Sequence, residues 1–524
     1  MTENFDDQHP TATSAGDVGH GDSEPAGPDE DFTLYEDAIR YFGQGNLAAA
    51  TQSLEDHLTH HPTHASAFSL LGNLHRLGGR FRDAEDAWRR YLKLKPGIRQ
   101  GLLEIGRCRL AAGDNRGADA MFHQYLADEG ETPESLYEVG MAFQQIANND
   151  EASAFHERAL ALKPDFHLAR QQLAVACHAR GELKLAEKLF RDVVRVQTSN
   201  FEVYRHLGAI HRDHGDLTTA LADFRHAMQL ERRAQKLDAE RDAGFGLVPR
   251  DIGLINLRVY AEQIAHLLEH NKLSDAYVKE LDRYREVLAE LSEQADSNLC
   301  ISLNESQRRR LGRSFCRLLH LGPLSAIPAG ALNHHLDFTA IRKRHAEEPR
   351  HVTVLDDFLS EEAVATLTGY CLESTIWFCP ARQGMIRSRL EDGFGNGLML
   401  QLVEELRTRF PNLLGQLRLS GMEGRIYAAR AYDLPTDEHT DGIVLIMWLS
   451  PDHANLEPDR GGLILQSRRG DAGSDSEIPQ NVRHRHNRAV LADDTLTIRP
   501  DDCQFRPGLV NRRLEICLRF TPRH

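Results

Sequence analysis

A histidine and an aspartate one residue apart, His439 and Asp441, carry the clearest chemical signal in the sequence. They open the stretch HTDGIVLIMWLSPDHANLEPDRGG, whose apolar run predicts a strand. Because strand side chains alternate between two faces, this spacing places an imidazole and a carboxylate on the same face. Such a pair supplies two ligands of an iron site built from two histidines and one carboxylate. The third ligand would be a histidine from a later strand.

Small and large residues recur with a period of 34 residues over residues 32–230, well before this pair in the sequence. Small residues are needed where paired helices cross closely, and large residues fill the space beside them. Three series in one register resemble six tetratricopeptide repeats, an all-helical solenoid whose groove binds a protein or peptide. A generic helical bundle would show no fixed period. The small residues are Ala50, Ala84, Ala118, Ala152, Ala186 and Ala220; Ala38, Gly72, Gly106, Gly140, Ala174 and Gly208; and Gly45, Gly79, Gly113, Ala147, Gly181 and Gly215; the large ones are Trp88, Phe122, Phe190 and Phe224.

Composition and patterning divide the rest of the chain. Residues 1–31 hold nine acidic residues and no lysine or arginine, which predicts a disordered acidic leader. Residues 231–330 keep helical periodicity without the 34-residue register and predict a helical cap or linker. Residues 331–524 show short apolar runs around one helix at about 397–409, which predicts a double-stranded β-helix, or jelly roll, with flanking helices. The expected fold class is therefore a multidomain α+β protein.

The overall composition limits the classes of partner. The chain has 524 residues and a formal net charge of −16, a balance that disfavours a nucleic-acid partner. Its sequence shows neither a basic leader followed by an apolar run nor an apolar stretch long enough to span a membrane. Its eight cysteines show no CxxC spacing, and this pattern is typical of reduced thiols. We therefore expect a cytoplasmic protein with a protein partner, and neither nucleic acid nor a membrane.

Seven blocks follow one another in the last domain: NHHLDFTAIRKRH, VLDDFLSEEAVATLTGYCLESTIWF, LEDGFGNGLMLQLVEELR, HTD, SPDHANLEPDRGGL, NRAV and FRPGLVNRR. In this order they resemble a bacterial family in which tetratricopeptide repeats precede an oxygenase domain that depends on 2-oxoglutarate and Fe(II). The resemblance implies that His439 and Asp441 are the first histidine and the carboxylate of the iron triad. It places the third ligand at Ile498, whose side chain cannot bind a metal.

The resemblance also implies that Arg513 would bind 2-oxoglutarate, with Arg512 the weaker candidate because it shares the parity of the apolar residues in the last strand. Glu515 stands where the family has a small polar residue, and a carboxylate there would pair with Arg513 and repel the dianionic cosubstrate. Val444 and Ile446 stand where the family has two inward-facing asparagines. These departures all fall on one pocket.

Two functions remain open. The leading one is a protein-binding scaffold fused to a catalytically degenerate oxygenase-like domain that needs no cofactor. The alternative is an active peptide or protein hydroxylase that uses Fe(II) and 2-oxoglutarate with an atypical third ligand. The last domain lacks the βαβ alternation of nucleotide-sugar folds, which disfavours a glycosyltransferase. Candidates for the substitute ligand are Asp501, Asp502, Cys503, His484 and His486.

Overall fold

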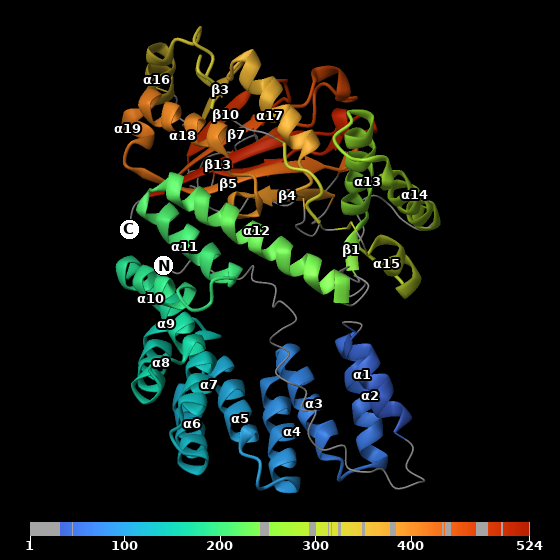
Figure 1. The fold of residues 1–524 in the computed structure, drawn as a ribbon, viewed down its shortest axis with the longest axis vertical. Helices are drawn as coiled ribbons and strands as arrows, with labels where there is room; N and C mark the ends of the chain where they lie inside the picture. Colours follow the sequence, from blue (N-terminus) through green and yellow to red (C-terminus); the bar gives the residue numbers. More distant parts are fainter. Residues whose placement is uncertain are drawn as a thin grey trace, which may run out of the picture. The chain divides into compact units, whose positions relative to one another are not determined.

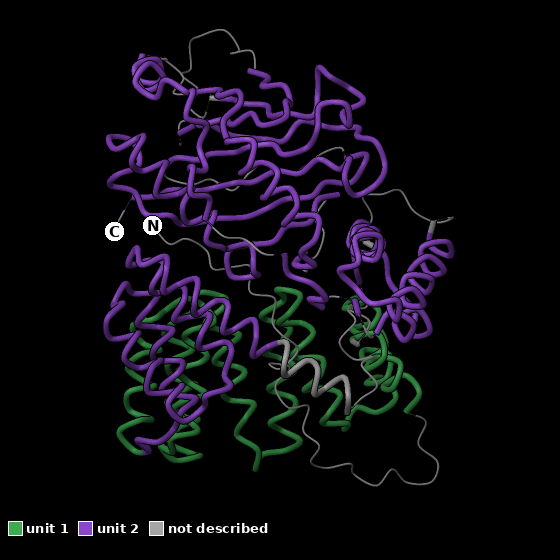
Figure 2. The backbone as a smooth tube through the Cα atoms, turned by 45° about the horizontal axis from the view of Figure 1, so that its top comes forward, with its two compact units in different colours: residues 1–162 green, residues 163–524 purple. Residues whose placement is uncertain are grey.

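The computed structural model describes residues 32–43, 46–241, 251–292, 300–312, 314–315, 317–322, 326–347, 352–377, 384–431, 434, 442–467, 480–493 and 496–522. The expected leader, residues 1–31, lies outside this set. Contacts divide the chain into two compact units, residues 1–162 and residues 163–524 (Figure 2). No helix in the described part of the chain is long and apolar enough to cross a membrane.

The first unit consists of helices packed in antiparallel pairs (Figure 1). Each predicted repeat contributes one pair, so the 34-residue register found in the sequence is the register of the helix pairs. The helices are α1 (Thr33–Gly43), α2 (Leu47–His60), α3 (Ala65–Leu77), α4 (Phe81–Leu94), α5 (Gln100–Ala111), α6 (Asn115–Glu129), α7 (Pro133–Gln144) and α8 (Asn149–Leu162).

The helix pairs depend on glycine at the crossings. A Cβ atom at Gly72 would lie 2.6 Å from Nε1 of Trp88, and one at Gly208 would lie 2.8 Å from the Phe224 ring. Both distances are too short for a side chain, so the aromatic ring occupies the space that glycine leaves. The turn between paired helices uses the left-handed region, with φ of 82° at Gly113. The spacing of small and large residues therefore reports real helix contacts.

The second unit begins with two further helix pairs. These are α9 (His167–Ala179), α10 (Leu183–Val194), α11 (Phe201–His214) and α12 (Leu217–Arg241). A helical segment with a small two-stranded sheet follows, and it contains the two amphipathic helices that periodicity predicts. Its elements are β1 (Asp251–Gly253), α13 (Leu254–Glu269), η1 (Asp275–Tyr277), α14 (Val278–Ser292), β2 (Cys300–Ser302) and α15 (Glu305–Leu311).

The remainder of this unit alternates strands and helices. The helix expected at about 397–409 is α18, and a second long helix, α17, was not expected. The elements are α16 (Phe338–Glu347), β3 (Val352–Leu355), α17 (Glu361–Glu373), β4 (Met385–Arg389), η2 (Leu390–Asp392), α18 (Gly397–Arg409), α19 (Pro411–Leu414), β5 (Leu417–Tyr427), β6 (Arg430–Ala431), β7 (Ile443–Trp448), η3 (Asp452–Ala454), β8 (Leu463–Ser467), β9 (Gln480–Val482), β10 (Ala489–Asp493), β11 (Leu496–Pro500), β12 (Cys503–Gln504), η4 (Leu509–Asn511) and β13 (Leu514–Pro522).

The strands form antiparallel sheets that pack through two separate cores. A six-stranded sheet has the order β3-β10-β7-β13-β5-β4, and a three-stranded sheet has the order β11-β8-β9. One face of the large sheet packs on α16, α17 and α18 through residues such as Leu514, Ile516 and Leu518. The opposite face packs on the small sheet through an apolar cluster. The C-terminal region is thus a multi-stranded antiparallel structure covered by helices on one side.

The last repeat is built into the first of these cores. Leu217, Ala220 and Phe224 of α12 belong to the same buried cluster as the sheet residues. Asp213, near the end of α11, is 3.3 Å from Nη1 of Arg418 in β5. Figure 1 shows α11 and α12 beside the sheet near β5 and β4.

Candidate functional site

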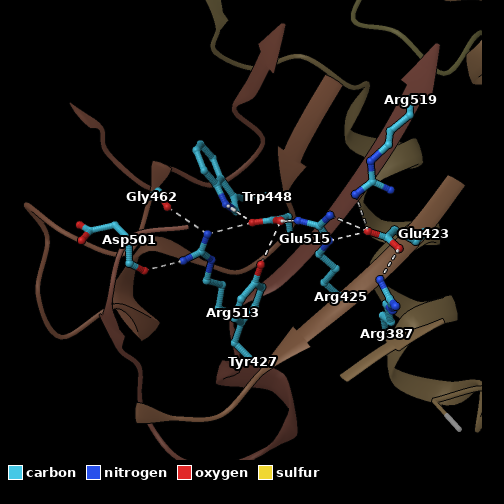
Figure 3. Close-up of polar contacts among 10 residues, drawn as sticks. All are labelled: Arg387, Glu423, Arg425, Tyr427, Trp448, Gly462, Asp501, Arg513, Glu515 and Arg519. Atoms are coloured by element: carbon cyan, nitrogen blue, oxygen red, sulfur yellow. Dashed lines mark hydrogen bonds and ion pairs between the residues drawn. The ribbon is translucent and has the colours of Figure 1, made fainter. Parts of the chain in front are cut away.

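A ladder of buried charged residues crosses three neighbouring strands of the large sheet (Figure 3). Glu423 and Arg425 alternate along β5, and Glu515 of β13 stands opposite Arg425 in the strand register. The same face carries Arg387 on β4 and Arg519 on β13. Charged side chains are almost never fully buried unless they are paired. The arrangement of these pairs decides what the site can bind.

Arg513 lies at one end of this ladder and is fully buried, with 0% of its surface exposed. Its guanidinium donates to the backbone oxygens of Asp501, at 3.1 Å, and Gly462, at 3.0 Å. It also donates to Oε2 of Glu515 at 2.9 Å and lies over the Tyr427 ring, 4.4 Å from the ring centre. The expected pair of Arg513 and Glu515 is therefore present.

Glu515 accepts hydrogen bonds on both oxygens. Its Oε1 receives Nη1 of Arg425 and the hydroxyl of Tyr427, each at 3.1 Å. Its Oε2 receives Nε1 of Trp448 at 3.1 Å, in addition to Arg513. Burial would raise the pKa of Glu515, but the charges of Arg513 and Arg425 hold that pKa below its ordinary value. The carboxylate is thus ionised and its acceptor sites are filled.

Glu423 binds the other side of Arg425. Its Oε1 accepts Nε of Arg425 at 2.7 Å and Nη2 of Arg519 at 3.1 Å. Burial opposes the charge of Glu423, but Arg425, Arg519 and Arg387 together lower its pKa well below the usual range. Arg425 therefore joins two buried carboxylates.

The predicted third ligand position is apolar. Ile498 of β11 is 6% exposed and lies in the same cluster as Val444 and Ile446 of β7. Ile498 pairs with Leu465 of β8, also in that cluster. The side chains of Ile498, Leu465, Val444 and Ile446 provide no lone pair for a metal ion. His439 and Asp441 lie outside the described residues.

Three of the candidate substitute ligands interact with other groups of the chain. Asp501 and Asp502 both face the guanidinium of Arg460, at 3.4 and 3.0 Å. Nδ1 of His486 is 3.1 Å from the backbone oxygen of Leu449. Within the described ranges, no three His, Cys, Asp or Glu side chains form a group that could hold a metal ion.

Two further candidates, His484 and Cys503, are buried near Arg513. His484 packs against Phe505, with ring centres 5.2 Å apart, and its Nε2 has no hydrogen-bond partner. Burial and the charge of Arg513 lower the pKa of His484 to about 3, so the ring is neutral. Burial raises the pKa of the Cys503 thiol. The charge of Arg513 would repel a cation bound beside it.

Arg512 forms an ion pair with another element of the chain and does not face the Glu515 carboxylate. Its Nε and Nη2 bind the two carboxylate oxygens of Glu262 in α13, each at 2.7 Å. This two-pronged pair ties the end of the chain to the helical segment. The parity argument that separated Arg512 from Arg513 agrees with this placement.

Sequence reasoning missed most of the ladder. Arg425, Glu423, Tyr427 and Trp448 reach Glu515 or its partners from strands far away in the sequence. One signal was available: Glu423 and Arg425 alternate in a long strand whose other residues are largely apolar. A charged pair at that spacing on a buried strand needs partners of opposite charge on the next strand.

Comparisons with known proteins support the repeat region. A family model described as a tetratricopeptide repeat matches residues 35–97. Human tetratricopeptide repeat protein 7B is 32% identical over 115 residues, which are 22% of this chain and 13% of that protein. Human protein O-mannosyl-transferase TMTC1 is 27% identical over 139 residues, 26% of this chain and 16% of that protein. The matched segments thus span less than a fifth of these relatives.

Two solved structures are similar to part of this chain. A tetratricopeptide repeat protein from Parabacteroides merdae is 18% identical, with a TM-score of 0.30, and the match covers 40% of this chain and 87% of that one. MamA from Desulfovibrio magneticus is 20% identical, with a TM-score of 0.27, covering 32% of this chain and 96% of that one. The N-terminal region of this chain is an array of tetratricopeptide repeats, and such repeats bind proteins or peptides.

Proposed function

We propose that this protein is a tetratricopeptide-repeat scaffold whose C-terminal domain is a catalytically degenerate oxygenase-like double-stranded β-helix. The repeats capture a protein or peptide partner. The two packed sheets and the sequence blocks of the last domain support the proposed fold. Five cysteines in the described residues, among them Cys503 and Cys517, are free thiols, which fits a cytoplasmic protein.

One observation carries the proposed loss of chemistry: Arg513, the candidate 2-oxoglutarate ligand, already has both terminal guanidinium nitrogens bonded within the chain. Its pairing with Glu515 leaves the guanidinium no accessible face, because both side chains are 0% exposed. A cosubstrate carboxylate would have to displace an ion pair that is already dry and hydrogen-bonded.

The residues present do not fit an iron centre either. Ile498 stands among apolar side chains where the resemblance requires a histidine. Removing a partner that only orients a ligand typically costs about 10–100-fold in metal affinity, and removing the ligand itself should cost at least that. No reaction step through iron or 2-oxoglutarate is therefore assigned to this domain.

Two measurements on the wild-type protein test this function. Titration calorimetry with Mn(II), with and without 2-oxoglutarate, should show weak metal binding that the cosubstrate does not enhance. A succinate-release assay with Fe(II) and 2-oxoglutarate should give no product. Succinate that appears in the wild type and disappears in His439→Ala would overturn the proposal and establish the hydroxylase.

A designed revertant makes the negative result informative. Ile498→His combined with Glu515→Asn supplies an imidazole and releases Arg513. Enhanced Mn(II) binding in the presence of 2-oxoglutarate is expected for this double variant. If it stays inert, the apolar residues Val444 and Ile446 become the next positions to change.

A further inference from the structure

The carboxylate of Glu515 has the surroundings of a bound ligand. Four donors from four side chains converge on it, at 2.9 to 3.1 Å, and three of them, Arg425, Tyr427 and Trp448, come from other strands. Two of the donors are guanidinium groups, from Arg425 and Arg513. Charge-assisted hydrogen bonds of this kind are about twice as strong as neutral ones.

The donors are held in place independently of Glu515. Arg513 is fixed by the backbone oxygens of Gly462 and Asp501, while Arg425 is fixed by two bonds to Glu423. Trp448 is fully buried in β7. Donors that need no reorganisation bind an anion without the cost of ordering side chains. The cradle should therefore persist when the Glu515 carboxylate is removed.

We propose that Glu515 fills a preformed carboxylate-binding site, and that shortening this side chain opens the site to a free small carboxylate. Alanine lacks the CH2 and carboxylate groups that follow Cβ in glutamate, a fragment with the size and charge of acetate. Acetate can thus supply an equivalent carboxylate to the donors in Glu515→Ala. The proposal rests on the donors around Glu515 and stands whatever the domain once catalysed.

The test is chemical rescue of the full-length Glu515→Ala protein. Its melting temperature should fall well below that of the wild type, because two buried guanidinium groups lose an anionic partner. Sodium acetate should raise that temperature in a saturable way, compared with sodium chloride at equal ionic strength. The wild type should not respond, and neutral acetamide should not replace acetate.

A second variant tests the donors. Adding Arg513→Met to Glu515→Ala should raise the acetate concentration needed for half of the effect by about tenfold or more, because one charge-assisted bond is lost. If Glu515→Ala is insoluble, its recovery on dilution from urea is compared in acetate and in chloride, and acetate should raise the yield. An equal response to chloride, or an equal response of the wild type, would overturn the proposal. The succinate assay uses only proteins that retain Glu515, so either conclusion can fail without the other.

Discussion

His156 occupies a position that Trp or Phe fills in four of the other five repeats. Trp88, Phe122, Phe190 and Phe224 stand at the same place in the 34-residue register. His156 packs against Gly140, where a Cβ atom would lie 2.6 Å from its ring, and both ring nitrogens lack a hydrogen-bond partner. Burial lowers the pKa of His156 to about 4. The neutral imidazole therefore fills the space beside Gly140 but leaves two buried nitrogens without hydrogen bonds.

His156→Phe should stabilise the protein. It removes a buried polar group without a partner, a defect that costs about 1–3 kcal/mol. The gain should increase as the pH falls from 6.5 toward 4: an unfolded histidine takes up a proton below about pH 6.5, whereas the folded His156 resists protonation until about pH 4. Stability supplied by neutral His156 is thus lost in that window.

Thermal melting of both proteins at pH 7.5 and pH 5.5 measures this effect. The variant should melt at the higher temperature, and by a larger margin at pH 5.5. His123→Phe is a suitable control because His123 is exposed on α6. A variant that loses as much stability on acidification as the wild type would show that His156 is not responsible.

At this scale the sequence predicted what depends on local spacing. The register located the glycine crossings, and strand parity separated Arg513 from Arg512 and paired Arg513 with Glu515. It did not predict that Arg425 would join the pair, because that contact links β5 to β13 across 90 residues. Nor does the register explain why the fourth repeat has histidine where four of the others have Trp or Phe.

Among the elements, α11 and α12 combine two roles. They are the sixth repeat by sequence, and they also pack against the sheet. Ala209, on α11, packs against the sheet core, and Asp213 is held by His178, Arg212 and Arg418. Burial opposes the charge of Asp213, but the hydrogen bond from His178 and the charges of Arg212 and Arg418 lower its pKa to about 2. This repeat is therefore part of the packed core of the C-terminal domain.

Phe224→Ala should therefore destabilise the C-terminal domain. Truncating a buried phenylalanine costs about 3–5 kcal/mol, and Phe224 lies in the core shared with the sheet. In a Trp88→Phe background, fluorescence comes from Trp377 and Trp448, both buried in the second unit. Their unfolding transition should move to lower temperature.

Phe122→Ala in the same background is the matched control. Phe122 fills the equivalent crossing beside Gly106 in the first unit. It should lower helix stability measured by circular dichroism and leave the tryptophan transition in place. Equal shifts of that transition in both variants would contradict the assignment of α12 to the C-terminal core.

For the whole molecule, repeat counting and packing place the boundary differently. Periodicity groups residues 32–230 together, because it reads only the local sequence pattern. Contacts instead divide the chain after residue 162, and the last two predicted repeats belong to the unit that contains the sheets. A periodic pattern cannot reveal this, since the same small and large residues mark a crossing whether its outer face meets solvent or another domain.

Two fragments test this division. Residues 163–524 should fold alone, with a cooperative tryptophan transition close to that of the full chain. Residues 242–524 lack α12 and expose the surface that covered Leu217 and Phe224, each worth about 1.5–3 kcal/mol when buried. They also lose the ion pair between Asp213 and Arg418. The two side chains together are worth about 3–6 kcal/mol, which reaches the lower part of the total stability of a typical domain, about 5–15 kcal/mol, so the shorter fragment should aggregate or melt without cooperativity. A soluble shorter fragment with an unchanged transition would show that the C-terminal domain folds without the sixth repeat, as the sequence pattern alone predicts.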